Sequence, residues 1–269
     1  MLSVVIITRN AREYAKSCID SVLEAIKHKS VEIIVVDNGS TDETVEILKN
    51  YRNSINFIQL EKNYGVAYAR NVALRAVNGD FIWILDIDTV ANREAADKML
   101  NYLENNLDCG LCSCRLQSNE GEVQDSCRHL PYPKYKIMNL LTGKLKKTKI
   151  KEKIEKINEK QFYRKELSGR EPFEAEYVIG ACQMFRKKIL DEVGYLDEKI
   201  FYGPEDADFC LRINRKGYKI VCLPDCYIIH HYNRVSNKKI FSRMAFLHFK
   251  GLLYFYMKLI FSYHKFQIL

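Results

Sequence analysis

The residues from Asp80 to Val90 read Asp-Phe-Ile-Trp-Ile-Leu-Asp-Ile-Asp-Thr-Val. The apolar first half of this stretch has the length of a buried strand, and two carboxylates, Asp86 and Asp88, follow it one residue apart. Carboxylate oxygens suit Mg²⁺ or Mn²⁺, and such ions usually bind phosphate oxygens as well. Aspartate is also a common turn residue, so the pair could simply end a strand and begin a turn. The rest of the sequence must decide between these two interpretations.

Upstream of this stretch, apolar β-branched segments alternate with segments whose apolar residues recur at helical spacing. Ser40 and Glu43 are spaced as a capping box at the start of one of the helices. Alternation of this kind predicts βαβ units and a mostly parallel sheet covered by helices on both faces. The expected strands are residues 2–8, 32–37, 56–60 and 80–86, and the expected helices are 11–27, 40–51 and 65–77.

Polar residues gather where these expected strands end, and ligands of parallel sheets bind at that edge. No Gly-x-Gly-x-x-Gly follows the first strand, which disfavours a dinucleotide-binding Rossmann domain. No Gly-x-x-x-x-Gly-Lys-Ser/Thr motif occurs either, which excludes a P-loop ATPase. The residues expected at this edge are Thr8, Asn10, Asp37, Asn38, Asn63, Asp86 and Asp88.

Downstream, a helix is expected at 92–105 and a strand at 109–116. Residues 176–186 read as a strand interrupted at Gly180, where a small residue lets a ligand approach the backbone. A short helix at 187–193 precedes a longer one from Glu205 to about residue 217, and the first turn of the longer helix is acidic. Short strands are expected at 218–223 and 227–231.

The chain has 269 residues, 47% of them hydrophobic and 28% charged, which indicates a globular protein with a sizeable core. The first residues form no basic leader, and no run of about 18 apolar residues occurs, so we expect neither a secretory signal nor a spanning helix. The nine cysteines favour a reducing cytosol over a disulfide framework. Cys109, Cys112 and Cys114 lack a fourth ligand at zinc-site spacing, so we interpret them as strand residues.

The net charge of +8 is concentrated in two segments. Residues 134–172 hold 13 Lys and Arg against 5 Asp and Glu, and residues 238–269 hold 6 Lys and Arg with no acid. Such segments favour phosphates, nucleic acid or an anionic membrane surface. Within the first segment, residues 144–160 have loosely helical spacing, which indicates a solvated helix or insertion, or a flap over a phosphate-rich surface.

Taken together, the separated motifs resemble glycosyltransferase family 2, the inverting nucleotide-sugar transferases of GT-A fold, over about residues 2–235. The similarity is greatest to the rhamnosyltransferase-like branch of bacterial surface-polysaccharide enzymes. The matching motifs are Ser3–Asn10, Val36–Asp42, Asn63–Asn71, Leu85–Thr89, Gly180–Arg186, Pro204–Arg212 and the pair His230-His231.

The resemblance implies a role for each of these positions. Asp206 resembles the catalytic base, and the metal would be held by Asp88 with Asp86 and His230. Glu205, Asp208 and His231 would bind the acceptor or support the site. The nucleotide sugar would be bound by Thr8, Asn10, Asp37, Asn63, Gly65, Arg70, Asp86 and Gly180.

These roles define a chemistry in which an acceptor hydroxyl attacks the anomeric carbon in one displacement, with Asp206 removing its proton. Mn²⁺ or Mg²⁺ would offset the charge on the leaving nucleoside diphosphate, and an imidazole ligand favours Mn²⁺ slightly. The donor is expected to be a UDP- or dTDP-sugar, including UDP-hexoses, UDP-N-acetylhexosamines and dTDP-rhamnose. The acceptor is expected to be a glycan or lipid-linked hydroxyl in cell-surface polysaccharide biosynthesis.

Three alternatives compete with a transferase. A sugar nucleotidyltransferase would need a Gly-rich loop after strand one, but Arg9-Asn-Ala-Arg-Glu stands there. A degenerate, non-catalytic scaffold would not need the acidic and histidine residues that the motifs retain. A nucleic-acid binder agrees with the basic segments, but no nucleic-acid motif is present, so we expect no such partner.

We expect a catalytic domain at 1–235, with a nucleotide-sugar half at 1–90 and an acceptor half at 91–235 that carries the basic insertion 134–172. Residues 236–269 would form a basic, aromatic, amphipathic tail. This tail would either lie in a membrane interface or pack on the domain with a basic edge. We favour the membrane, which would place the enzyme in the cytoplasm, peripheral at the inner face of the cell membrane. Five basic side chains should share an arc about 100° wide: Lys239, Arg243, Lys250, Lys258 and Lys265.

Overall fold

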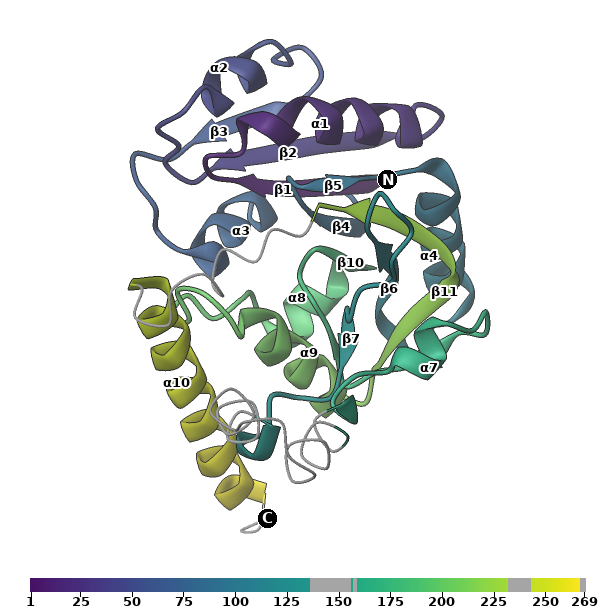
Figure 1. The fold of residues 1–269 in the computed structure, drawn as a ribbon, viewed down its shortest axis with the longest axis vertical. Coiled ribbons are helices and arrows are strands. Elements are labelled where there is room, and N and C mark those ends of the chain that lie inside the picture. Colours follow the sequence, from purple (N-terminus) through teal and green to yellow (C-terminus); the bar gives the residue numbers. More distant parts are fainter. Residues whose placement is uncertain (136–155, 157–158, 232–242, 267–269) are drawn as a thin grey trace.

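The computed structural model describes residues 1–135, 156, 159–231 and 243–266. Within these residues, nine strands form a central sheet in the order β3-β2-β1-β4-β10-β6-β11-β5, with β8 paired to β11 (Figure 1). A second sheet contains β7 (Cys127–Arg128) and β9 (Tyr177–Val178). The strands of the central sheet are β1 (Leu2–Thr8), β2 (Val31–Asp37), β3 (Asn56–Gln59), β4 (Phe81–Asp86), β5 (Thr89–Val90), β6 (Cys109–Gln117), β8 (Phe173–Glu174), β10 (Cys182–Arg186) and β11 (Lys219–His230).

The register of the sheet brings the expected polar strand ends together. Strands β3, β2, β1 and β4 are parallel, and Thr8 lies beside Asp37 while Ile7 lies beside Asp86. Strand β10 is antiparallel to both β4 and β6, and β6 is parallel to β11. The carboxyl ends of β1, β2 and β4 therefore meet at one edge, as βαβ topology requires.

Helices cover both faces of the sheet, and a long helix, α10, runs outward from one side (Figure 1). Helices α1 and α4 pack with one core cluster, while α3, α8 and α9 pack with the other. The helices are α1 (Arg12–Ile26), α2 (Thr44–Lys49), α3 (Val66–Leu74), α4 (Arg93–Asn105), α7 (Arg164–Leu167), α8 (Lys188–Val193), α9 (Glu205–Arg215) and α10 (Arg243–Phe266).

Strand β4 is buried because alternate side chains face different cores. Trp83 and Leu85 belong to the cluster under α1 and α4, whereas Ile82 and Ile84 belong to the cluster under α3 and α9. A strand with two buried faces is expected to be continuously apolar, as residues 81–85 are. This burial fixes the position from which Asp86 leaves the sheet.

The predicted elements agree with the structure except at three places. The predicted Ser40–Glu43 capping box is wrong, because Ser40 bonds to Asp37 instead. At the first turn of α2, it is Asp42 Oδ1 that accepts a hydrogen bond, from Thr44 N at 3.1 Å. The interruption predicted at Gly180 within 176–186 is confirmed, but the two halves, β9 and β10, belong to different sheets instead of to one strand. The two strands predicted after residue 218 are one strand, β11, with an irregularity between Leu223 and Tyr227.

Parts of the basic segments lie outside the described residues. One part is 136–155, which contains most of the helical pattern at 144–160. Another is 232–242, where we expected the domain boundary at 235. The domain division therefore stays a prediction. None of the described helices has the length and apolarity needed to cross a membrane.

Candidate active site

Asp86, Asp88 and His230 come together at the carboxyl end of β4. One potential ligand atom from each of these residues lies within 4.8 Å of the others. His230 Nε2 is 3.5 Å from Asp88 Oδ1, and the imidazole is almost fully buried. Two carboxylates and an imidazole form a donor set that suits Mn²⁺, with phosphate or water oxygens as further ligands.

A tight turn and a strand pairing deliver these three side chains. Thr89 Oγ1 donates to the Asp86 carbonyl at 2.8 Å and closes the turn between β4 and β5. Strand β5 pairs antiparallel with β11, so that Thr89 lies beside His230. His231 N then donates to the Asp88 carbonyl at 2.8 Å. The end of β11 is thereby attached to the acidic turn, although the two segments are far apart in sequence.

Gln124 contacts His230 on the side opposite Asp88, and no sequence motif indicated this residue. The Nδ1 of His230 lies 2.7 Å from Gln124 Oε1, and Gln124 Nε2 donates to the His230 carbonyl at 2.7 Å. An amide oxygen can only accept, so Nδ1 carries the hydrogen and Nε2 faces Asp88. Gln124 lies just after a hairpin and belongs to none of the sequence motifs, so its role became evident only from its position beside His230.

The electrostatics of this trio favour a bound cation. Burial raises the pKa of Asp86, with the nearby charge of Asp88 acting in the same direction and Arg70 opposing it. Burial acts to lower the pKa of His230, but the hydrogen bond and charge of Asp88 outweigh it, and the net shift is upward. Two partly buried carboxylates this close together repel each other unless positive charge lies between or beside them.

Arg70 connects the acidic turn to helix α9. Its Nη2 donates to Asp86 Oδ1 at 2.7 Å and to the Gly180 carbonyl at 2.9 Å, and its Nη1 lies 3.5 Å from Glu205 Oε1. The guanidinium is 2% exposed. A Cβ at Gly180 would lie only 2.2 Å from Arg70 Nη1, so residue 180 must be glycine for this packing. The predicted donor residue Arg70 therefore lies between two carboxylates.

Glu205 and Asp206 begin α9 and differ in their surroundings. Glu205 is buried, and its Oε2 has no hydrogen-bond partner among the described residues. Burial, together with the charge of Asp206, raises the pKa of Glu205 to about 7. Asp206 is half-buried, with Oδ2 accepting from Gly180 N at 3.2 Å and Oδ1 from Ala207 N at 2.7 Å. Gly180 thus contacts both Arg70 and Asp206.

The ends of β1 and β2 form a network of polar loops. Asp37 is fully buried and its carboxylate accepts from Ser40, at 3.0 Å from the backbone nitrogen and also from the hydroxyl. Asn10 Oδ1 accepts from Thr41 N at 2.8 Å. Thr8 is buried, and no described group bonds its hydroxyl. These contacts hold the turn after β2 against the end of β1.

A second network orders the segment before α3. Asn38 Nδ2 donates to Asn63 Oδ1 and to the Gly65 carbonyl, both at 3.1 Å, and Asn38 Oδ1 accepts from Tyr64 N. Gly65 N donates in turn to Asn63 Oδ1 at 2.9 Å. The predicted donor residues Asn63 and Gly65 therefore lie beside the end of β2.

The side chains of two predicted site residues, Asp208 and His231, contact residues outside the group of Asp86, Asp88 and His230. Asp208 is buried in α9 and forms ion pairs with Arg212 at 2.9 Å and with Lys258 of α10. The His231 ring stacks on Tyr14, with ring centroids 5.3 Å apart, and its Nδ1 is 3.4 Å from Asn119 Nδ2. Asp208 thus joins two helices, while the His231 ring turns toward α1.

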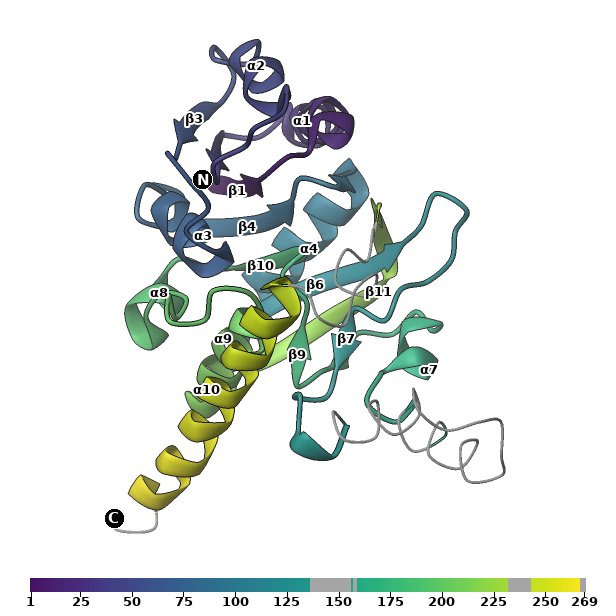
Figure 2. The ribbon, with the colours of Figure 1, turned by 60° about the vertical axis from the view of Figure 1, so that its left-hand side comes forward.

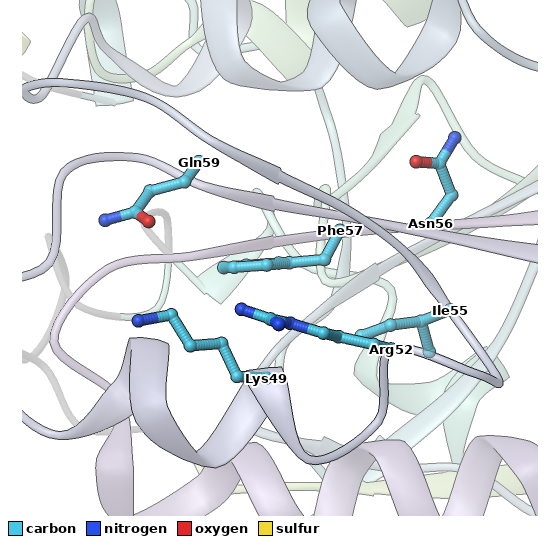
Figure 3. Close-up of a pocket in the computed structure, with 6 residues that line it drawn as sticks. All are labelled: Lys49, Arg52, Ile55, Asn56, Phe57 and Gln59. Carbon is cyan, nitrogen blue, oxygen red and sulfur yellow. The ribbon is translucent and has the colours of Figure 1, made fainter.

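A separate pocket of about 480 Å³ lies between α2 and the edge strand β3. In Figure 3, Lys49 and Arg52 extend beneath Phe57 of β3. None of the predicted site residues lines this pocket, so it does not contribute to the candidate active site. Its lining residues are Lys49, Arg52, Ile55, Asn56, Phe57 and Gln59.

The mixed sheet with helices on both faces has the GT-A architecture, and comparison with known proteins agrees. Residues 3–194 match the model of "Glycosyl transferase family 2". The chain belongs to this family and is a glycosyltransferase.

Particular relatives are similar in sequence and in structure. The poly(ribitol-phosphate) beta-N-acetylglucosaminyltransferase TarP of Staphylococcus aureus is 35% identical over 243 residues, covering 88% of this chain and 64% of TarP. The mannosyltransferase PcManGT of Pyrobaculum calidifontis, solved with GDP-Man and Mn²⁺, gives a TM-score of 0.60 at 17% identity, covering 87% of this chain and 58% of that one. TarS of S. aureus, solved with UDP-GlcNAc, gives 0.57 at 19% identity, covering 91% and 64%.

Proposed function

We propose that this glycosyltransferase is metal-dependent and moves a sugar from a nucleoside-diphosphate sugar to an acceptor hydroxyl with inversion. The observation that carries the proposal is one continuous site. One ligand atom each of Asp86, Asp88 and His230 lies within 4.8 Å of the others, and Arg70 connects Asp86 to Glu205 at the start of α9. Donor and acceptor groups would therefore meet between the end of β4 and the start of α9.

In this proposal Asp88, Asp86 and His230 hold the divalent ion, with Asp88 the main ligand. When bound, the ion would offset the negative charge of the leaving diphosphate. The solved structure of PcManGT with Mn²⁺ supports a divalent ion in this fold, and the imidazole of His230 favours Mn²⁺ over Mg²⁺. Gln124 keeps Nε2 of His230 directed at the ion site.

Asp206 is the proposed base, and it would accept the proton of the attacking hydroxyl. Its Oδ2 is held by Gly180 N, which orients the carboxylate near the Arg70 side of the site. Arg70 keeps Asp86 and Glu205 from repelling each other, and Thr8, Asn10, Asp37, Asn63 and Gly65 would shape the nucleotide end. A half-buried carboxylate in a fixed orientation suits proton transfer better than a mobile one.

The donor class remains that expected from sequence, a UDP- or dTDP-sugar. The names of TarP and of the TarS complex with UDP-GlcNAc support UDP-N-acetylhexosamines as the first donors to test. dTDP-rhamnose stays in the set because the motifs resemble the rhamnosyltransferase-like branch. The acceptor is proposed to be a glycan or lipid-linked hydroxyl of a cell-surface polysaccharide, reached from the cytoplasmic face of the membrane.

A donor screen followed by two variants tests this function. Thermal shift with each nucleotide sugar and Mn²⁺ should single out one donor, and transfer to acceptor should then be detected by mass spectrometry. Asp88→Ala should abolish Mn²⁺-dependent donor binding, whereas Asp206→Asn should bind donor nearly as wild type and lose transfer. Transfer at the wild-type rate by the Asn variant would refute the base assignment. Donor binding without any transfer by wild type would favour the scaffold alternative.

A further inference from the structure

Helix α10 has two faces with opposite environments. One face packs on the catalytic domain, with Phe255 fully buried and Leu252 nearly so. Tyr256 Oη donates to the Pro131 carbonyl at 2.6 Å, and Lys258 Nζ pairs with Asp197 at 2.8 Å and with Asp208. Lys258, one of the five residues of the predicted basic arc, therefore points toward the domain, because the buried Asp208 carboxylate draws its ammonium inward.

The helix also approaches the loop that leads into α9. A Cβ at Gly251 would lie 2.4 Å from the Gly203 carbonyl, so the helix and this loop touch backbone to backbone. The rings of His248 and Tyr202 lie edge to face, with their centroids 6.1 Å apart. Figure 2 shows α10 lying along α9 with its first turns near the start of α3. The packed face thus supports the loop that precedes Glu205 and Asp206.

The opposite face of α10 carries an exposed apolar stripe. At about 100° per residue, its members fall within about 80° of arc, and the centre of this arc is nearly opposite Phe255. Large apolar side chains left in water on a single stripe indicate an interaction surface. The stripe consists of Phe246 (67% exposed), Phe249 (64%), Leu253 (52%), Met257 (43%) and Ile260 (59%).

The charges beside the stripe identify what it contacts. Arg243 and Lys250 are exposed and lie along one border of the stripe, and the sequence from 238 to 269 contains no acidic residue. Apolar side chains bordered by basic ones are the pattern of a helix that lies in the headgroup region of an anionic bilayer. We propose that the apolar stripe of α10 docks on an anionic lipid surface while its opposite face stays packed on the domain.

This docking gives the bilayer a defined position relative to the site. Because α10 touches the loop before Glu205, a lipid surface under the stripe would lie on the acceptor side of the candidate site. A lipid-linked hydroxyl would then be presented toward Asp206. This assignment of the acceptor rests on the proposed function, whereas the docking itself rests on α10 alone.

Co-sedimentation of the full chain with vesicles tests the docking. Wild type should bind vesicles of mixed phosphatidylglycerol and phosphatidylcholine, and weakly or not at all vesicles of phosphatidylcholine alone. The double variant Phe249→Asp with Leu253→Asp should bind the anionic vesicles about a hundredfold more weakly. Arg243→Gln and Lys250→Gln should each weaken binding about fivefold. Leu107→Asp, at a 71% exposed leucine after α4, is the matched control and should bind as wild type.

Each outcome has a defined meaning. Equal binding by the stripe variant and wild type, or no binding of wild type to anionic vesicles, would overturn the docking. Wild type could instead form a dimer in sedimentation equilibrium that the stripe variant does not form, while wild type does not bind vesicles. That result would assign the stripe to self-association and would also overturn the docking. Donor binding with Mn²⁺, measured in parallel, separates the two proposals. Intact donor binding alongside failed vesicle binding would leave the transferase standing.

Discussion

At the scale of single residues, the site depends on side chains that orient other side chains. Gln124 contacts His230 through both its amide oxygen and its amide nitrogen. Arg70 touches two carboxylates and one carbonyl at once. Gln124 is half-buried and Arg70 is buried, so neither side chain offers a large ligand much surface. Each acts mainly by fixing the geometry of its neighbours.

Replacing Gln124 with methionine should weaken metal binding without unfolding the protein. Methionine keeps most of the volume but cannot accept from His230 Nδ1, so the imidazole loses its fixed tautomer. Loss of such a supporting hydrogen bond typically lowers metal affinity about 10- to 100-fold. Titration of Mn²⁺ followed by electron paramagnetic resonance measures this affinity directly. Gln117→Met, in the same hairpin but paired with Ile229 in the strand register, is the control, and equal affinities in the two variants would rule out the orienting role.

Replacing Glu205 with glutamine should change how stability depends on pH. The folded-state pKa of Glu205 is about 7, above its usual 4.5, so the folded chain holds a proton that the unfolded chain has released. Stability from this group therefore falls as pH rises between about 4.5 and 7. Relative to wild type, the variant should gain on the order of 2 kcal/mol between pH 5 and pH 8. Urea unfolding at both pH values checks this, and a pH-independent difference would contradict it.

At the scale of elements, α10 is attached to α9 through a buried ion pair. Asp208 is 1% exposed and contacts both Arg212 of its own helix and Lys258 of α10. Removing one partner of a buried charge leaves that charge poorly compensated. The attachment of the tail to the domain is thus specific, and the apolar contact of Phe255 alone does not account for it.

Lys258→Met should accordingly destabilise the protein by about 2 kcal/mol, because Asp208 and Asp197 both lose a cation. Lys250→Met on the same helix is exposed, and it should change stability by no more than about 0.5 kcal/mol. Denaturant unfolding of both variants measures the difference. Equal stabilities would mean that α10 does not pack on the domain through this contact.

At the scale of the whole molecule, the proposed metal site joins segments from two parts of the chain. Asp86 ends β4 and Asp88 follows it, whereas His230 ends β11, beyond β10 and β6 in the sheet. A ligand that binds across this junction binds the folded chain and not the unfolded one. Binding should therefore raise the melting temperature in proportion to its free energy.

UDP at about a hundred times its dissociation constant, added in the presence of saturating Mn²⁺, should add about 2.7 kcal/mol relative to Mn²⁺ alone and raise the melting temperature by several degrees. EDTA should reverse the shift, and Asp88→Ala should not show it. Asp108→Ala, at a surface carboxylate paired with Lys219, should keep it. A shift of equal size in both variants would place the ion elsewhere.

Much of the fold could be predicted from sequence because its signals are local. Continuous apolar runs such as residues 81–85 identify buried strands, and the helix predicted from residue 92 begins there, with Asn92 Oδ1 accepting from Ala95 N at 2.9 Å. The family motifs then indicated the transferase class. The capping box at Ser40 failed because the Ser40 hydroxyl donates to Asp37, at the end of β2, and accepts from Asn10 N instead of from a helix N–H.

Local patterns could not show which distant groups meet. Arg70 and Glu205 are 135 residues apart, and Gln124 and His230 are 106 apart. Their contacts depend on the order of strands in the sheet, where β10 is inserted antiparallel between β4 and β6.

By itself, the amino-acid sequence determined the strands, most helices, the acidic pair Asp86 and Asp88, and the family. Only the tertiary structure decided that Gln124 orients His230, that Arg70 joins the acidic turn to α9, and that Lys258 faces inward. The reason is physical: helical and strand periodicity reflect each residue's nearest neighbours along the chain. Hydrogen bonds between distant segments form only after the sheet has brought those segments together.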